Sequence, residues 1–249
     1  QWNLLFCARK DGNSYFIYGF GIKALVSIFR SDLIHTHHIK SGFIFTLFSK
    51  ILRKKTIFTL HGSISNASTL NKILFSIILI FIDKLVLVSP SLLNAVKLFK
   101  VSKYFDIDIE VIPNGIDLNI KSISNELILD KFNIDKSAKI ILHPARFVVE
   151  KNHIRLLQAM KIVKDKCSDN IILVLCGNGE LHDKIKNEVA INNLQNIVVF
   201  TNLIPREDVI SLLDKCELYV MPSISEGLNV SFLEALAKTK KILVSNIVS

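Results

Sequence analysis

The chain has 249 residues, half of them hydrophobic, and a net charge of +9. This length and apolar content can bury one large core or two small ones, which excludes a disordered chain. The four cysteines are far apart without C-x-x-C spacing, which favours reduced core residues of a cytosolic protein over a disulfide framework or zinc site.

The positive charge is concentrated in the front half of the chain. Residues 1–120 carry 14 basic and 7 acidic side chains, whereas the remainder carries 17 and 15. A basic half indicates an anionic partner, although a merely solvated basic surface is an equally good interpretation. Nucleic acid is disfavoured because no aromatic and basic stripe stands out. We therefore expect a cytoplasmic protein with peripheral contact at the inner, anionic face of the membrane.

Short apolar runs alternate with segments of helical period, which is typical of parallel sheets covered by helices. The run Ile73–Ile82 is too short to span a bilayer and predicts a buried helix, with an interfacial role as the weaker alternative. The strands predicted in the front half are Leu4–Ala8, Leu33–His37, Thr56–Leu60, Leu85–Ser89 and Ile109–Ile112.

A domain boundary is predicted after the segment VIPNGID, Val111–Asp117. Pro113 ends the preceding strand, and Asn114-Gly115 is a turn signal. Residues 118–136 then lose strand character, as expected of a connector. We therefore predict one domain over residues 1–120 and a second over residues 121–249.

The back half repeats the alternation of strands and helices, so two doubly wound units in tandem are predicted. Its predicted strands are Lys139–Ala145, Ile171–Cys176, Ile197–Phe200, Leu218–Pro222 and Ile242–Ser245. Its predicted helices cover residues 152–167, 180–192, 206–215 and 229–238. The last strand lies at the chain end, so we expect the second sheet to be incomplete.

The segment PSISEGLNVSFLEAL, Pro222–Leu236, places two acids around a glycine where a strand leads into a helix. A helix start favours a phosphate, and Gly227 lets backbone approach an anion closely. Glu226 and Glu234 would repel a lone phosphate but are good acceptors for sugar hydroxyls. Either acid alone could simply complement the helix dipole. Together they predict a sugar-nucleotide site.

Two further strand ends carry suitable residues, because ligands of open parallel sheets bind at the carboxyl ends of strands. Arg146 and Lys151 follow one strand and could bind the same diphosphate, although two surface cations are an equally good interpretation without the other observations. Another predicted strand is followed by the segment Gly177-Asn178-Gly179 and then by Glu180. The third glycine of the dinucleotide fingerprint is missing, which disfavours an NAD enzyme.

Histidines follow two strands of the front half. His61 could donate to a sugar hydroxyl or a phosphate. His35, His37 and His38 invite a metal hypothesis, which we disfavour because successive strand residues point to opposite faces and no carboxylate completes the set. The acids of Asp106–Glu110 resemble a cation-binding D-x-D motif, but their alternation with isoleucine favours the polar face of an edge strand.

Taken together, these motifs resemble the group 1 family of retaining GT-B glycosyltransferases, and the resemblance covers nearly all of the chain. The segments that carry it are DLIHTHH, FTLHGS, VIPNGID, the Arg146–Lys151 loop, CGNGE and the E-x7-E pattern from Glu226 to Glu234. The resemblance implies an α/β protein with two Rossmann-like, doubly wound parallel-sheet domains facing across a cleft.

By the same resemblance, the second domain would hold a nucleotide-diphosphate sugar. Arg146 and Lys151 would bind its diphosphate together with the backbone of Gly227 and Leu228. Glu226 would contact the donor sugar and assist at its anomeric carbon.

The resemblance also implies that Glu234 would bind the ribose hydroxyls and that Gly177, Gly179 and Glu180 would lie near the base. His61 would lie by the sugar from the opposite wall. No cofactor or obligatory metal is implied, and attack would occur on the face from which the nucleotide leaves.

The sequence departs from the family pattern in four places. The glycine usual two residues after Phe200 is replaced, since the local sequence is Phe200-Thr201-Asn202. The glycine-rich turn after the first strand is not evident, although Lys10–Asn13 stands near the expected place, and Asn229 occupies a position that is often glycine or proline. The family's last strand and returning helix are missing, so we expect the chain to be truncated at its C-terminus.

The sequence therefore predicts a glycosyltransferase that moves a sugar from a nucleotide-diphosphate donor to a glycan or lipid-linked acceptor with retention of configuration. Two alternatives stay open: a nucleotide-sugar epimerase on the same fold, and a catalytically silent nucleotide-sugar-binding domain.

Overall fold

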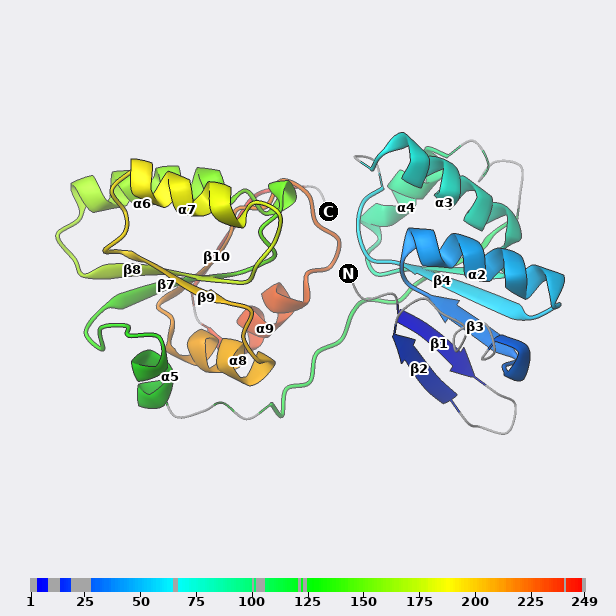
Figure 1. Cartoon of the computed structure of the whole chain (residues 1–249), viewed down its shortest axis with the longest axis horizontal. Coiled ribbons are helices and arrows are strands. Elements are labelled where there is room, and N and C mark those ends of the chain that lie inside the picture. The colour runs from blue at the N-terminus through cyan, green and yellow to red at the C-terminus, as the bar shows by residue number, and fades with distance from the viewer. Residues whose placement is uncertain are drawn as a thin grey trace. The chain divides into compact units, whose positions relative to one another are not determined.

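The computed structural model describes residues 4–8, 14–18, 28–64, 67–99, 101, 106–120, 122, 125–239 and 241–247. The segment Lys10–Asn13, which stands near the expected place of the family's glycine-rich turn, lies outside these residues. The chain divides into two compact units between Asn114 and Gly115, the turn dipeptide noted in the sequence (Figure 1). Within the described part of the chain, every helix is too short or too polar to cross a bilayer.

The first unit contains a six-stranded sheet in the order β2-β1-β3-β4-β5-β6. Its strands are β1 (Leu4–Ala8), β2 (Ser14–Tyr18), β3 (Leu33–Thr36), β4 (Lys55–Leu60), β5 (Lys84–Leu87) and β6 (Asp108–Val111). Strands β3 to β6 are parallel, as predicted.

The prediction of a wholly parallel front sheet is wrong for β1, which pairs antiparallel with both β2 and β3. The sequence analysis also missed β2. Five residues separate β1 from β2, a length that permits a hairpin, whereas parallel strands need a crossover of roughly a dozen residues or more. An apolar run does not encode strand direction.

Three helices cover the parallel part of this sheet: α2 (Ile39–Ile51), α3 (Thr69–Phe81) and α4 (Ser91–Lys97). Because β3 to β6 are neighbours in chain order and crossovers between parallel strands are right-handed, all three helices lie on the same face. Helices α2 and α3 pack side by side (Figure 1). The buried Phe45, Phe58 and Phe75 lie at the interface between helices and sheet.

The second unit contains a five-stranded sheet that is parallel throughout, which confirms the prediction. Its order is β11-β10-β7-β8-β9, with strands β7 (Lys139–Pro144), β8 (Ile171–Cys176), β9 (Val198–Asn202), β10 (Leu218–Met221) and β11 (Ile242–Val244).

Helices cover both faces of this sheet, and a separate cluster of buried apolar side chains lies between the sheet and the helices on each face. They are α5 (Asn125–Lys131), α6 (His153–Lys166), α7 (His182–Ile191), α8 (Arg206–Lys215) and α9 (Val230–Lys238). Helix α5 lies within residues 118–136, where a polar connector that has lost strand character was predicted. That interpretation is wrong because the apolar Ile128 and Leu129 are buried against α8.

Asp83 joins the starts of β4 and β5 in the first unit. Its Oδ2 accepts from Thr56 N at 2.8 Å and Thr56 Oγ1 at 3.0 Å, and Lys55 Nζ lies 3.4 Å from Oδ1. Burial alone would raise the pKa of Asp83, but the Thr56 hydrogen bonds and the charge of Lys55 together lower it. The folded state therefore favours the ionised carboxylate.

We expect Asp83→Asn to lower the free energy of unfolding by about 1 kcal/mol at pH 7, because a charged acceptor is lost. Since the folded pKa lies below the unfolded one, this contribution is present above about pH 4 and disappears as the pH falls through the folded pKa. Urea denaturation of both proteins between pH 3 and 7 measures it, with the exposed Asp165→Asn as control. A difference in the free energy of unfolding between the two proteins that stays the same from pH 3 to 7 would contradict the role given to the Asp83 carboxylate.

Candidate active site

The strand order of the second sheet reverses at β7, because the chain runs from β7 to β8 and β9 on one side and then to β10 and β11 on the other. Ligands of such sheets bind outside the carboxyl ends of the strands at this switch point. The loops that follow β7 and β10 therefore define the candidate site. They contain Lys151 and Glu226 respectively.

Lys151 and Glu226 form an ion pair through Nζ and Oε1. The same carboxylate oxygen accepts from Ser223 Oγ at 2.6 Å and from Asn229 Nδ2 at 3.2 Å. The two charged side chains are only 13% and 10% exposed, respectively. Removing two charges from water is costly, and the additional hydrogen bonds offset part of that cost. The structure thus holds Glu226 in one orientation by three donors.

Two hydrogen bonds join the loops that carry Lys151 and Glu226. Between backbone groups, Ile224 N donates to Glu150 O at 2.9 Å, and the side chain of Asn152 donates from Nδ2 to Pro222 O at 3.1 Å. Asn152 adopts a left-handed conformation with φ of 55° at the start of α6, a region that asparagine tolerates better than most residues. One backbone and one side-chain hydrogen bond therefore hold the loop of Lys151 against the loop of Glu226.

The start of α9 lies directly after Gly227 and Leu228, as the sequence predicts. Asn229, noted in the sequence as a departure from the family pattern, is the N-cap of this helix, because its Oδ1 accepts from Ser231 N at 2.9 Å. An asparagine N-cap satisfies one of the unpaired amides of a first turn. Asn229 thus caps the helix through its Oδ1 and donates to Glu226 through its Nδ2.

Glu234 lies in the second turn of α9 with only 6% of its side chain exposed. Arg206 Nε, at the start of α8, donates to its Oε1 at 2.6 Å. The two acids of the E-x7-E pattern are therefore neutralised by different cations, Lys151 and Arg206. The predicted contacts of Glu226 and Glu234 with sugar hydroxyls remain predictions.

Arg146 is exposed in the loop after β7. The loop after β8 packs against the loop after β7. Phe147 N donates to Asn178 O at 3.0 Å, and Leu181 N donates to Phe147 O at 3.0 Å. A Cβ on Gly177, where φ is +145°, would lie 2.0 Å from Ala145 O. A Cβ on Gly179 would lie 2.5 Å from Phe147 O. These glycines permit the close contact of the two loops, and Glu180 is exposed beside them.

Sequence reasoning missed Ser223, Arg206 and His143 as parts of this region. His143 is buried in β7 and donates Nδ1–H to Val220 O at 2.8 Å, and burial is the main cause that lowers its pKa to about 4. The sequence did contain a signal for Arg206. A cation in the first turn of a helix is unfavourable beside the positive end of the helix dipole, so an acidic partner elsewhere is expected.

The histidines of the first unit lie together at the carboxyl ends of β3 and β4, with His35 inside β3 and His37 and His61 just after the two strands. His37 Nδ1 is 2.9 Å from His61 Nε2, and His35 Nε2 is 2.7 Å from Thr59 Oγ1. Burial is the main cause that lowers the pKa of all three, that of His37 to about 4. Among the described residues, no group of three or more potential ligands is arranged to hold a metal. A role for His61 at a sugar stays a prediction.

Two acids of the apparent D-x-D segment, Asp108 and Glu110, lie on β6, the edge strand of the first sheet, and Asp106 precedes that strand. Lys84 Nζ contacts Asp108 at 3.3 Å and Glu110 at 2.9 Å. A single lysine on the neighbouring strand therefore pairs with both acids, in agreement with the interpretation as a polar strand face.

Two family models match the chain in succession. Residues 3–120 match the model described as Glycosyltransferase Family 4, and residues 124–249 match the one described as Glycosyl transferases group 1. The chain belongs to the group 1 glycosyltransferases. The family predicted from the sequence is therefore confirmed.

Characterised relatives of this glycosyltransferase chain include an Escherichia coli enzyme, UDP-Gal:alpha-D-GlcNAc-diphosphoundecaprenol alpha-1,3-galactosyltransferase. It is 25% identical over 91% of the chain, and the match spans 62% of its own length. The N,N'-diacetylbacillosaminyl-diphospho-undecaprenol alpha-1,3-N-acetylgalactosaminyltransferase of Campylobacter jejuni is 33% identical over 51% of the chain and 31% of its own length. The chain thus spans less than two thirds of these enzymes.

Solved structures share the fold. HepE of Anabaena in complex with UDP-glucose matches with a TM-score of 0.77 and 20% identity, over 90% of this chain and 62% of HepE. Sucrose-phosphate synthase of Thermosynechococcus elongatus matches with a TM-score of 0.70 and 20% identity, over 90% and 61% of the two chains. The predicted GT-B fold is confirmed.

We expect Gly177→Ala to destabilise the second unit by roughly 2 kcal/mol or more, because the new Cβ meets a backbone oxygen at a strained φ. Thermal unfolding followed by circular dichroism measures the loss. Gly115→Ala in the same unit is the control, since nothing lies within 4 Å of its Cβ position. Equal melting temperatures for the two variants would show that the loop contact is not tight.

Proposed function

We propose that this chain carries the donor site of an enzyme that transfers a sugar from a nucleoside-diphosphate sugar to a glycan or lipid-linked acceptor with retention of configuration. The observation that carries the proposal is the ion pair of Lys151 and Glu226 at the switch point of a parallel sheet. The names of two relatives, one with a UDP-sugar donor and both with diphosphoundecaprenol acceptors, support the substrate classes.

The donor diphosphate would be neutralised by side chains of this chain. Arg146 presents an exposed guanidinium after β7, and Lys151 presents an ammonium five residues later. Such cations bind phosphate oxygens through charge-assisted hydrogen bonds. The amides of Gly227 and Leu228 lie in the loop before α9, whose dipole favours the same charge. The proposal therefore requires no metal.

The transfer breaks the bond from the anomeric carbon to the diphosphate oxygen, and the electron pair leaves with the nucleoside diphosphate. The acceptor hydroxyl oxygen forms the new bond on the same face, and its proton passes to the departing diphosphate oxygen. Glu226 would stabilise the positive charge that develops at the anomeric carbon. Its fixed orientation by Lys151, Ser223 and Asn229 suits this role.

We expect Lys151→Ala to weaken the binding of a nucleoside diphosphate by about ten- to a hundred-fold, because a charge-assisted hydrogen bond is lost. Calorimetry with UDP, GDP and ADP measures the change. The exposed Lys161→Ala on α6 is the matched control and should bind as the parent chain does. Unchanged binding in Lys151→Ala would contradict the diphosphate site.

We expect Glu226→Gln to retain donor binding within a few-fold and to lower sugar transfer by at least about a hundred-fold, because a stabilising charge is removed. Mass spectrometry of a panel of nucleotide sugars and acceptors measures transfer. Full activity in this variant would defeat the assignment. An isomerised donor sugar without acceptor would indicate an epimerase, and binding without any transfer would indicate a silent domain.

A ribose role for Glu234 predicts discrimination by sugar hydroxyls. We expect a ribonucleoside diphosphate to bind about ten- to a hundred-fold more tightly than its 2′,3′-dideoxy analogue, because bonds to a carboxylate are lost. Glu234→Gln should reduce this ratio, and Arg206→Gln should reduce it too by releasing the carboxylate. Arg155→Gln, an exposed arginine on α6, is the control. Equal ratios in all variants would exclude a ribose contact.

A further inference from the structure

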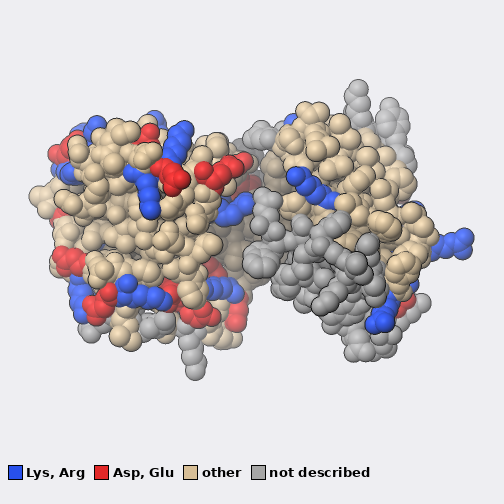
Figure 2. All heavy atoms as spheres, viewed as in Figure 1, with Lys and Arg blue, Asp and Glu red and all other residues tan. Residues whose placement is uncertain are grey.

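Helices α2, α3 and α4, which cover one face of the first sheet, contain no acidic residue. The sequences of α2, α3 and α4 contain Lys40, Lys50, Lys72 and Lys97 and no aspartate or glutamate. By contrast, α7 and α8 of the second unit carry both signs of charge. Figure 2 shows this difference, since red and blue are mixed over the second unit while the described atoms over α2 and α3 are tan with little blue.

Large apolar side chains on these helices are exposed. Ile51 in α2, Leu70 and Ile73 in α3 and Leu98 at the end of α4 are each more than half exposed. A single exposed leucine needs no explanation, but apolar groups gathered on neighbouring helices mark an interaction surface. We call the outer side of α2, α3 and α4, with these four residues and the four lysines, the helix face.

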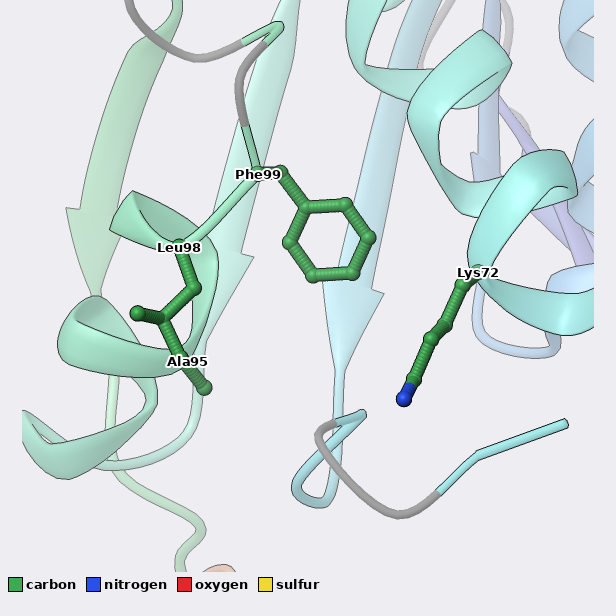
Figure 3. Close-up of a pocket in the computed structure, with 4 residues that line it drawn as sticks. All are labelled: Lys72, Ala95, Leu98 and Phe99. Atoms are coloured by element: carbon green, nitrogen blue, oxygen red, sulfur yellow. The ribbon is translucent and has the colours of Figure 1, made fainter. Parts of the chain in front are cut away.

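A hollow of about 260 Å³ opens between α3 and the end of α4. The described residues that line it are Lys72, Ala95, Leu98 and Phe99. Figure 3 shows the Phe99 ring and the Lys72 side chain extending into the same space from these two elements. The ring packs edge-on against Phe75 with centroids 5.3 Å apart. The hollow thus joins an apolar wall to one ammonium group.

We propose that the helix face is a docking surface for a bilayer that contains anionic phospholipid. Its apolar side chains enter the boundary between headgroups and acyl chains, while the lysine ammonium groups remain at the headgroups. The hollow accepts an apolar segment against Leu98 and Phe99 with an anionic group at Lys72. A nucleic acid would leave the apolar side chains in water, so charge and exposure together favour the lipid surface.

The charge of the face determines the expected strength of binding. Each lysine near an anionic membrane surface contributes roughly 1 kcal/mol, and the absence of acids on the three helices means that no opposing repulsion reduces the sum. This attraction falls off within about one Debye length, roughly 10 Å at 0.1 M salt. The proposal does not depend on the donor site and extends the proposed function by holding the chain where lipid-linked acceptors are found.

The test is co-flotation of the 249-residue chain with vesicles of phosphatidylcholine alone or mixed with phosphatidylglycerol, at low and high salt. We expect binding to the mixed vesicles only, weakened by salt. Lys72→Gln with Lys97→Gln should lower the partition coefficient by about thirty-fold, the equivalent of roughly 2 kcal/mol. Ile51→Ser with Leu98→Ser should lower it as well, since less apolar area enters the boundary.

Matched variants of the second unit are the controls. Lys161→Gln with Lys186→Gln removes two exposed lysines, and Ile162→Ser with Ile191→Ser removes two exposed isoleucines, all from α6 and α7. These four substitutions should leave vesicle binding unchanged. UDP, GDP and ADP binding, measured on the same samples, should be the same in all variants, which separates a failure of the membrane surface from a failure of the donor site.

Several outcomes would overturn the proposal. No flotation at low salt would exclude a membrane surface, and equal flotation with uncharged vesicles would exclude an electrostatic one. Equal losses in the face variants and the controls would show that the helix face is not the site. If light scattering shows that the face variants dissociate an oligomer while vesicle binding persists, the face contacts a second copy of the chain.

Discussion

The ion pair of Lys151 and Glu226 is the interaction on which the candidate site depends. It forms because the chain reverses its strand order at β7, which brings the loops after β7 and β10 beside each other although their residues are 75 positions apart. A buried carboxylate without a partner would be strongly unfavourable, so the pair also constrains both loops. The hydrogen bonds from Ser223 and Asn229 complete this constraint from the second loop itself.

Much of the second unit was predictable from its sequence because parallel strands buried on both faces read as continuous apolar runs. The five strands found there were predicted, and the rule that ligands bind at carboxyl strand ends pointed to the loops after β7 and β10, which lie beside each other in the structure. Strand direction in the first unit was not predictable from the same signal. Apolar runs at β1 and β3 look alike, yet the strands pair antiparallel.

The side-chain partners were beyond sequence reasoning for a different reason. Arg206 is 28 residues before Glu234, and Lys151 is 75 residues before Glu226, so no local spacing connects them. Helix α5 was missed because, among its residues whose side chains are described, 127–131, two are buried, Ile128 and Leu129, and so few apolar positions do not establish a period. The glycines at 177 and 179 were noted for ligand approach, but the structure shows that they also admit a neighbouring backbone.

These partners resolve a difficulty in the sequence itself. Two buried acids beside an anion site should repel both each other and a diphosphate, which argues against placing them in one loop and helix. Each acid instead has its own cation, one from the loop after β7 and one from the start of α8. The spacing of eight positions separates a loop carboxylate from one in the second turn of α9, so each reaches a different element. In this chain the E-x7-E pattern thus rests on two cations supplied from distant segments, and a substitution of either cation should disturb its own acid first.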